Sequence, residues 1–383
     1  MKKILITGGA GFIGSEIVKQ LSKTNEYKIT VLDAMTKQIH GEQWQKSYLY
    51  REIKNRCHFI KGDICSIDDV MDALADNEII IHLAAETGTG QSMYQINQYN
   101  EVNIMGTSNI FQAISTLGRK SKVRKIVLSS SRSVYGEGKY VCPKCGIVYP
   151  GTRIKEKMLS GDFNMYCDRC GNRVEVTGTS EDSLITPNSL YAFTKYAQER
   201  MLQTMCPAMS IDYTIFRFQN VYGVGQSLKN PYTGILSIFS TLMLENKPID
   251  IFEDGLESRD FINVVDIAAG VIKSLECCES NSKIINLGSG VGTSVIEIAN
   301  MLRDIYYSKS EINITGNFRI GDIAHNFADI TEAKRILGFK STVDLRDGLR
   351  EFCNWVLGEE KDNSGYEKSL AEMERAGMFC KIK

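Results

Sequence analysis

The stretch KKILITGGAGFIGSEIVKQL, residues 2–21, decides the fold. It begins with a short apolar run, continues with a glycine-rich turn and ends in an amphipathic helical pattern. A second apolar segment, YKITVLD at 27–33, follows, so these residues predict a β-α-β unit. Gly8, Gly11 and Gly14 lie in the turn, where missing side chains let a helix N-terminus approach a pyrophosphate. We therefore expect a dinucleotide to bind at this turn.

Two aspartates at strand ends indicate which dinucleotide this is. Asp33 ends the second strand, where its carboxylate can accept a hydrogen bond from a ribose 2'-hydroxyl and would repel a 2'-phosphate. This favours NAD over NADP, although the nearby Lys37 weakens the preference. Asp63 ends the next strand, within reach of an adenine amino group.

Further apolar segments continue the alternation of strands and helices. The strands are CHFIKGD (57–63), EIIIHLAA (78–85) and RKIVLSSS (124–131), separated by helical patterns at 68–76 and 103–115. This rhythm predicts an α/β protein with a Rossmann-type, doubly wound parallel sheet.

The overall composition excludes several classes of protein. Lysine and arginine total 45 against 46 acidic residues, so no basic surface is available for nucleic acid or for an acidic membrane. The start MKKILITGGAG is too short in apolar residues for a signal peptide, and no run of 18 apolar residues occurs. We expect a cytoplasmic protein that binds a small molecule and has no membrane partner.

A pair of residues at helical spacing suggests acid-base chemistry. Tyr191 and Lys195 in SLYAFTKYAQERM (189–201) are four positions apart, which places them on one face of a helix. An ammonium group beside a phenol lowers the phenol's pKa and so makes it a usable base. Ser131 ends the strand at 124–131, at the edge where such sheets bind ligands, and could donate a hydrogen bond to a reacting oxygen.

The segments TGGAGFIG, HLAA, SSSRSVYG, YAFTK, FRFQNVYG and SRDFINVVD resemble the extended short-chain dehydrogenase/reductase family that acts on nucleotide sugars. The resemblance implies that Ser131, Tyr191 and Lys195 are catalytic and that Asn103 lies on a supporting helix. The residues that we assign to the cofactor site are Gly8, Gly11, Phe12, Ile13, Gly14, Asp33, Asp63, Ile64, Leu83, Ala84, Ala85, Asn103, Ser129, Tyr191 and Lys195. The resemblance also implies an NAD-binding domain at 1–222 and a smaller C-terminal substrate-binding domain, mainly 223–383, with some segments returning to the sheet.

Planar guanidinium groups suit the diphosphate of a sugar nucleotide. The second half of the chain offers Arg217, Arg259 and Arg319, and the latter two match diphosphate-binding positions of the family. The full set that we assign to the substrate is Gln91, Ser92, Ser131, Arg132, Asn220, Arg259 and Arg319. Helical patterns at 233–244, 295–306 and 344–357 would form the substrate domain, and the segment after Gly358 is expected to be a surface helix or a frayed end.

The residues after Ser131 help to select the reaction. Dehydratases of the family carry an Asp-Glu pair there, whereas this chain has Arg132 and Ser133, which cannot serve as the acid and the base of an elimination. Glu137 is the nearby carboxylate, and we expect it to be solvated. The remaining chemistry favours a 4-epimerase that works through a transient 4-keto sugar. A reductase, a 4,6-dehydratase and, from another class, a non-catalytic NAD-sensing scaffold stay open as alternatives.

Two cysteine pairs interrupt the interval between Tyr135 and Tyr191. CPKCG and CDRCG supply Cys142, Cys145, Cys167 and Cys170, a set that suits a closed, structural zinc site within an insert at 138–180. Free thiols, disulfides and a nucleic-acid finger are the alternatives. Cysteine pairs at this place resemble the bacterial dTDP-L-rhamnose 4-epimerase subgroup, from which Ala324 departs because that subgroup tends to have arginine there. The family further implies a homodimer.

Overall fold

The computed structural model describes residues 1–228, 234–359, 371, 372, 374, 375, 377 and 379–381. Its centre is a sheet of seven strands, and every neighbouring pair in it is parallel. In spatial order the strands are β3 (His58–Lys61), β2 (Tyr27–Asp33), β1 (Lys2–Thr7), β4 (Ile79–His82), β5 (Lys125–Ser131), β9 (Asp212–Phe218) and β13 (Lys283–Leu287). The order reverses between β1 and β4, which is where ligands bind in open sheets of this kind.

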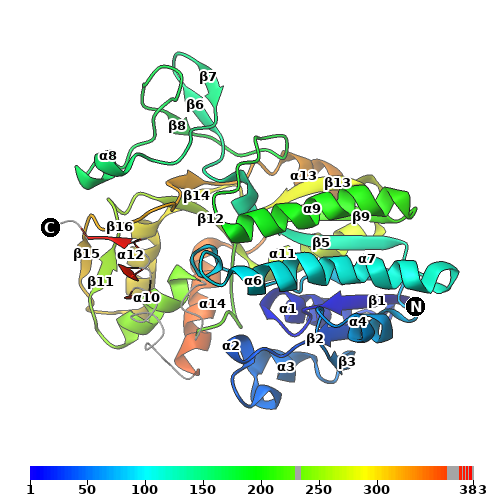
Figure 1. The fold of residues 1–383 in the computed structure, drawn as a ribbon. Coiled ribbons are helices and arrows are strands. Elements are labelled where there is room, and N and C mark those ends of the chain that lie inside the picture. Colours follow the sequence, from blue (N-terminus) through cyan, green and yellow to red (C-terminus); the bar gives the residue numbers. More distant parts are fainter. Residues whose placement is uncertain (229–233, 360–370, 373, 376, 378, 382–383) are drawn as a thin grey trace.

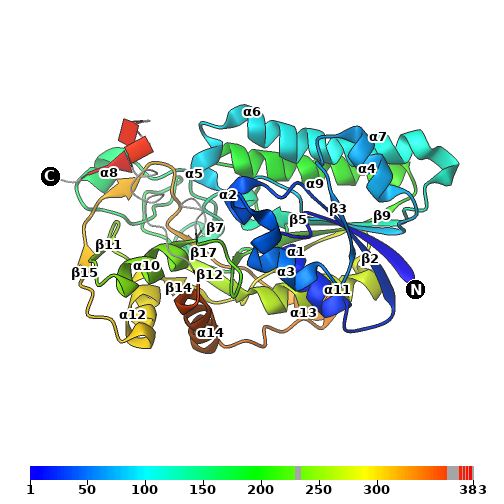
Figure 2. The same ribbon diagram turned by 90° about the horizontal axis from the view of Figure 1, so that it is seen from below.

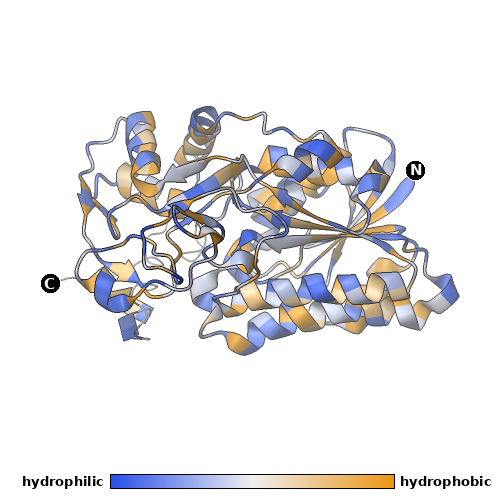
Figure 3. Cartoon of the chain, turned by 90° about the horizontal axis from the view of Figure 1, so that it is seen from above, coloured by the Kyte–Doolittle hydropathy of each residue, from blue (hydrophilic) through white to orange (hydrophobic). Residues whose placement is uncertain are grey.

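Helices cover both faces of the sheet, and the strands between them are buried and largely apolar (Figures 2 and 3). One face carries α4 (Ile67–Leu74), α7 (Gly106–Leu117) and α9 (Leu190–Ala208). The other carries α1 (Phe12–Leu21), α3 (Tyr48–Ile53), α11 (Val264–Glu276) and α13 (Thr331–Leu337). The predicted Rossmann-type architecture is confirmed.

The second half of the chain builds a smaller unit beside the carboxyl ends of the strands, which we call the substrate half after the role expected of it (Figure 1). Its core is formed by α10 (Ile235–Leu244), α12 (Val295–Tyr306) and α14 (Leu345–Leu357), as the helical patterns predict. Short strands complete it: β10 (Asn220–Tyr222), β11 (Ile249–Ile251), β12 (Ser258–Asn263), β14 (Gly292–Ser294), β15 (Ile312–Ile314), β16 (Phe318–Arg319) and β17 (His325–Asn326). Three elements of this half return to the Rossmann sheet: β13 is its edge strand, and α11 and α13 pack on one of its faces.

The cysteine insert stands out from the body of the molecule at the top of Figure 1. It contains a three-stranded antiparallel sheet and one short helix: β6 (Tyr140–Cys142), β7 (Gly146–Val148), α8 (Lys155–Leu159) and β8 (Glu175–Val176). Three further short helices lie near the sheet edge in the first half: α2 (Lys37–His40), α5 (Thr89–Ser92) and α6 (Ile96–Tyr99).

The last described residues correct an expectation about the tail. Strand β18 (Phe379–Cys380) pairs antiparallel with β16, and the ring of Phe379 lies 5.1 Å from that of Phe252. Residues 379–380 are therefore a strand of the substrate half, whereas the described residues 371, 372, 374 and 375 are helical, as the expectation of a surface helix has it. Residues 360–370 of the same prediction lie outside the described residues. No described helix combines the length and the apolar composition needed to cross a bilayer.

Candidate active site

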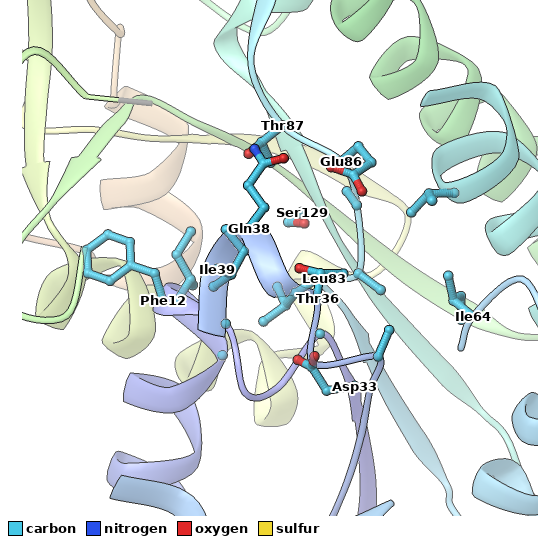
Figure 4. A pocket seen from close by; sticks show the side chains of 18 of the residues that line it. Phe12, Asp33, Thr36, Gln38, Ile39, Ile64, Leu83, Glu86, Thr87 and Ser129 are labelled. Carbon is cyan, nitrogen blue, oxygen red and sulfur yellow. The ribbon is translucent and has the colours of Figure 1, made fainter. Parts of the chain in front are cut away.

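A cavity of about 900 Å³ opens at the carboxyl ends of the parallel strands. Figure 4 shows Asp33 at its lower end, Glu86 and Thr87 at its upper end and Ser129 between them. Of the residues assigned to the cofactor site, the structure brings all but Asn103 to its wall: Gly8, Gly11, Phe12, Ile13, Gly14, Asp33, Asp63, Ile64, Leu83, Ala84, Ala85, Ser129, Tyr191 and Lys195. Ser131 lines the same cavity. The geometry therefore joins the glycine turn and the predicted acid-base residues in one space.

The glycine turn leaves no room for side chains. Gly8 has a φ of +68°, and a Cβ atom there would lie 2.7 Å from the backbone nitrogen of Ala84. A Cβ atom on Gly14 would lie 2.5 Å from the carbonyl oxygen of Gly8. Helix α1 begins after Gly11 with no side-chain cap, so its first N–H groups remain available to a ligand. This cradle fits the pyrophosphate of a dinucleotide.

Asp33 is fixed at the end of β2 by the main chain. Its two carboxyl oxygens accept hydrogen bonds of 2.9 Å from the N–H groups of Ala10 and Met35. Burial raises the pKa of Asp33, and these bonds together with the charge of His40 oppose the effect. A carboxylate has about four acceptor positions, so Asp33 can still accept from a ribose hydroxyl. Lys37 forms an ion pair with Glu42 and is exposed.

Tyr191 lies at the N-terminal end of α9, whose first turn is capped by the hydroxyl of Ser189. Burial raises the pKa of Tyr191, while the hydrogen bond with the Ser131 side chain and the charge of Arg132 lower it. Ser131 is therefore the hydroxyl residue that acts on the phenol. The charge of Arg132 acts on the phenol in addition to that expected of Lys195.

Lys195 is 2% exposed. Burial lowers its pKa to about 7, against the opposing charge of Glu199 one helical turn further on. Sequence analysis missed Glu199, although its four-residue spacing from Lys195 places both on one face of the helix. Glu199 also accepts bonds of 2.9 and 2.7 Å from the guanidinium of Arg217.

Arg217 is consequently not free to bind a phosphate. Its Nη1 donates to the hydroxyl of Tyr135 and to the carbonyl oxygen of Glu181, at 2.8 and 3.0 Å. With Glu199 also bound, the buried guanidinium is committed to structural contacts, so the structure does not support Arg217 as one of the three candidate arginines for the diphosphate. Nothing local in the sequence distinguishes this arginine from the others, because its partners lie on other elements.

Asn103 does not line the cavity. It lies in a π-helical turn, Asn100–Met105, and is fully buried. Its side chain accepts from the N–H of Glu86 at 2.8 Å and donates to the hydroxyl of Thr194 at 2.9 Å. Asn103 therefore ties the loop after β4 to α9, so its contribution to the cavity is indirect.

The loop after β4 contains two of the residues assigned to the substrate. Gln91 and Ser92 are buried in α5, and neither lines the cavity. Gln91 accepts hydrogen bonds from Tyr99 and from Gln38, at 3.3 and 3.2 Å. Gln38 does line the cavity and was missed. Its position a few residues beyond a strand end is the signal that could have identified it.

The other assigned substrate residues lie outside the cavity wall. Arg259 donates to the carbonyl oxygens of Ile323 and Ala324, at 2.7 and 2.9 Å. Arg319 lies over the ring of Phe252 at 5.0 Å, and its Nε atom has no hydrogen-bond partner among the described residues. The Oδ1 atom of Asn220 also has no hydrogen-bond partner among the described residues. Burial, together with the charge of Arg259, lowers the pKa of Arg132 to about 9, so Arg132 stays charged at neutral pH.

Glu137 is buried and only 6% exposed, so the expectation of a solvated glutamate was wrong. Burial raises the pKa of Glu137 to about 7 against the charge of Arg153. Its Oε2 atom accepts from the N–H of Ala324 at 2.9 Å and from the hydroxyl of Tyr140 at 3.4 Å. Because Arg153 and Ala324 are distant in the chain, the sequence gives no local sign of this burial.

The four predicted cysteines come together in the insert. The sulfur atoms of Cys142, Cys145, Cys167 and Cys170 all lie within 4.8 Å of one another. Four thiolates at about 2.3 Å from a tetrahedral zinc lie about 3.8 Å apart, so the cluster fits that ion. All eleven cysteines are free of disulfides.

Comparisons with known proteins agree with this geometry. A profile of the NAD dependent epimerase/dehydratase family matches residues 4–150 and 165–288. A dTDP-L-rhamnose 4-epimerase from Burkholderia thailandensis is 36% identical over 361 residues, covering 94% of this chain and 96% of that protein. A putative UDP-glucose 4-epimerase from Methanocaldococcus jannaschii is 31% identical, covering 94% of this chain and 99% of that protein. The crystal structure of UDP-glucuronic acid 4-epimerase from Bacillus cereus, with UDP-glucuronic acid and NAD, is similar at a TM-score of 0.75 and 27% identity, covering 93% of this chain and 99% of that one.

Proposed function

Since the chain belongs to the NAD-dependent epimerase/dehydratase family, we propose that it is a nucleotide-sugar 4-epimerase. The observation that carries the proposal is that Ser131, Tyr191 and Lys195 line the same cavity as the glycine turn and Asp33. An acid-base group and a dinucleotide site in one cavity are what reversible oxidation of a sugar carbon requires.

The residues at the cavity have different roles in this reaction. Tyr191 takes the proton of the sugar 4-hydroxyl and later returns it, while Ser131 donates a hydrogen bond to the same oxygen. The sugar passes through a transient 4-keto form and turns over in the site before it is reduced on its other face. Arg132 and Ser133 follow Ser131, and Glu137 is bound to Ala324 and Tyr140, so the acid and base of a dehydratase are not supplied there.

The cofactor in this proposal is NAD, which the related Bacillus cereus structure contains. The N-terminus of α1 would hold its pyrophosphate, Asp33 a ribose hydroxyl and Asp63 the adenine amino group. When bound, NAD supplies a reversible acceptor for hydride. Lys195, buried beside Tyr191, would bind the second ribose and regain its positive charge against a polar ligand.

The substrate in this proposal is a (deoxy)hexose nucleotide, and dTDP-L-rhamnose is the first candidate. The Burkholderia thailandensis relative carries that name, and related structures contain UDP-glucose or UDP-glucuronic acid. Arg132, Arg259 and Arg319 provide cationic groups for the diphosphate. Gln91, Ser92 and Asn220 would shape the sugar side of the site.

The proposal extends to the cysteine insert and to the assembly. Cys142, Cys145, Cys167 and Cys170 would hold one structural zinc, since four thiolates leave no position open for catalysis. Reduced thiolates of this kind suit a cytoplasmic protein. A homodimer is proposed through the helical segments that contain Asn103 and Tyr191, which are the π-helical turn Asn100–Met105 and α9.

A panel of nucleotide sugars tests the function directly. Purified protein is incubated with dTDP-L-rhamnose, UDP-glucose and UDP-glucuronic acid without added NAD, and the products are examined by nuclear magnetic resonance. The expected result is the C4 epimer of at least one substrate. A requirement for stoichiometric reduced cofactor would instead identify a reductase, loss of water would identify a dehydratase, and NAD binding without any turnover would favour the scaffold.

A further inference from the structure

The two ends of the cysteine insert hold one segment of the substrate half, residues 322–329. At the first end, Glu137 accepts the N–H of Ala324, and the hydroxyl of Tyr140 donates to the carbonyl oxygen of His325 at 3.5 Å. At the second end, Thr179 pairs with Ala328 as in a parallel sheet. The N–H of Thr179 donates to the carbonyl oxygen of Phe327 at 2.9 Å, and that of Asp329 donates to the carbonyl oxygen of Thr179 at 3.0 Å.

A buried ion pair adds a third attachment. Arg153, in the middle of the insert, binds both carboxyl oxygens of Glu253 in the substrate half. The two side chains are 4% and 2% exposed. The same guanidinium donates to the carbonyl oxygen of Asp322 at 2.9 Å. Buried bidentate pairs of this kind fix geometry, and removing one partner leaves the other charge uncompensated.

Ala324 belongs to the small apolar core of the insert itself. It is 2% exposed and packs with Tyr140, Cys142, Val148 and Cys167. The insert thus contacts this residue through its backbone and through its side chain. Any displacement of the insert would move the segment at Ala324.

The same segment orients Arg259. The carbonyl oxygens of Ile323 and Ala324 accept from the guanidinium, together with that of Ser258 at 2.9 Å. Two of the three acceptors that aim Arg259 therefore belong to backbone that the insert holds.

We propose that the insert is a clamp on residues 322–329 and that Arg153 is a positioning residue, which sets Arg259 for the substrate diphosphate through that segment. The inference rests on the proposed function for the role of Arg259. The contacts of Arg153 are with the substrate half, on the side of Arg259. We therefore expect the insert to affect nucleotide binding and not the chemistry at Tyr191. The expectation is a change in KM with little change in kcat.

The test compares Arg153→Ala and Arg153→Lys with Lys155→Ala, an exposed residue of the same insert. Calorimetry measures the Kd of dTDP and of UDP, while bound NAD and the midpoint of thermal unfolding report the fold. We expect Arg153→Ala to raise the Kd of the preferred nucleotide, and the KM of its sugar, about tenfold, with kcat within about twofold. Arg153→Lys keeps the charge but not the fork, so it should lie between wild type and Arg153→Ala, while Lys155→Ala should match wild type.

The outcomes separate this inference from the proposed function. An Arg153→Ala protein that holds NAD and binds dTDP and UDP as wild type does would overturn the clamp, whatever sugar is turned over. If Arg153→Ala does not fold, an unchanged Kd in Arg153→Lys would overturn the clamp instead. If Arg153→Ala raises the Kd of the nucleotide while wild type epimerises no sugar, the clamp is supported and the proposed function is rejected. A wild type that binds neither nucleotide would overturn both.

Discussion

The environment of Tyr191 determines how readily its phenol exchanges a proton. Burial raises the pKa of Tyr191, and the Ser131 side chain and the charge of Arg132 oppose that effect. Lys195 is buried next to it with a pKa lowered to about 7. At neutral pH the lysine is therefore close to its midpoint, and small changes in its surroundings decide whether it carries a charge. Acid-base activity here depends on how these neighbours are held.

Replacing Tyr191 by phenylalanine removes the proposed base and little else. We expect Tyr191→Phe to lower kcat by about 10²- to 10⁴-fold, since that is the usual contribution of a general acid-base group. Bound NAD and thermal stability should stay as in wild type. Tyr196→Phe, on the same helix and outside the cavity wall, is the matched control and should retain full turnover. Unimpaired epimerisation by Tyr191→Phe would show that another group is the base.

The lowered pKa of His82 predicts how the stability of the fold depends on pH. It is 1% exposed, its Nδ1 lies 2.7 Å from the hydroxyl of Thr7, and its Nε2 lies 2.9 Å from that of Thr107. Burial, with the charge of Lys195, lowers the pKa of His82 from 6.5 to about 3. Between these values the unfolded chain binds a proton that the folded chain does not. The stability contributed by neutral His82 is therefore complete above pH 6.5 and is lost as the pH falls toward 3.

Between pH 6.5 and about 3, protonation of His82 should lower the free energy of unfolding by about 1.4 kcal/mol for each pH unit. The free energy of unfolding, measured in urea at pH 7 and at pH 5, is compared between wild type and His82→Gln. The stability advantage of wild type should shrink by about 2 kcal/mol at the lower pH. An advantage that is equal at both pH values would show that His82 does not remain neutral in the folded protein.

At the scale of elements, the turn between β1 and α1 is the part of the site most constrained by space. Both Gly8 and Gly14 approach the backbone of their neighbours too closely for a side chain. The pattern could be recognised in the sequence because these contacts are local: strand, turn and helix follow one another within residues 2–21.

Gly14→Ala should therefore disturb the cofactor site. Its Cβ atom would meet the carbonyl oxygen of Gly8 at 2.5 Å, so the helix must move away from the turn. We expect a loss of about 1–3 kcal/mol in the free energy of unfolding and the loss of bound NAD, read from the absorbance of the denatured extract. Gly151→Ala, where a Cβ atom would meet nothing within 4 Å, is the control. NAD retained at the wild-type level in Gly14→Ala would contradict the cradle.

The cysteine insert brings four sulfur atoms together, and we propose that they hold zinc. Wild type should contain about one zinc per chain, and the double variant Cys142→Ser, Cys167→Ser should contain none, measured by mass spectrometry of metals. We also expect the variant to unfold at a lower temperature, because the small core around Cys142 and Cys167 loses its metal anchor. The exposed Cys278, outside the cluster, provides Cys278→Ser as a control that keeps the metal. An unchanged zinc content in the double variant would refute the site.

At the scale of the whole molecule, features that join distant segments could not be predicted from the sequence. The Rossmann strands, the helices of the substrate half and the cysteine cluster follow from local periodicity or from the spacing of one residue type. The burial of Glu137, the pairing of Arg217 with Glu199 and the pairing of β18 with β16 do not. Each of them depends on a partner that only the tertiary fold brings near, and an isolated charged residue in a sequence looks solvated.

The last prediction concerns assembly of the protein through the surface near α6 and α9. Ile96 on α6, Met105 in the π-helical turn and Phe193 on α9 are 52%, 55% and 52% exposed. Apolar side chains that gather on packed helices mark an interaction surface more often than isolated ones do. Two copies of the chain joined here would cover these side chains and would brace the helix that carries Tyr191 and Lys195.

Met105→Lys combined with Phe193→Lys should therefore convert a dimer into a monomer, because the two-fold contact would bring like charges together. Sedimentation equilibrium measures the mass, and bound NAD shows that the monomer is folded. The control is Tyr307→Lys, which changes a side chain that is 92% exposed on the substrate half and should leave the dimer intact. Wild type that sediments as a monomer, or a double variant that sediments as a dimer, would place the assembly surface elsewhere.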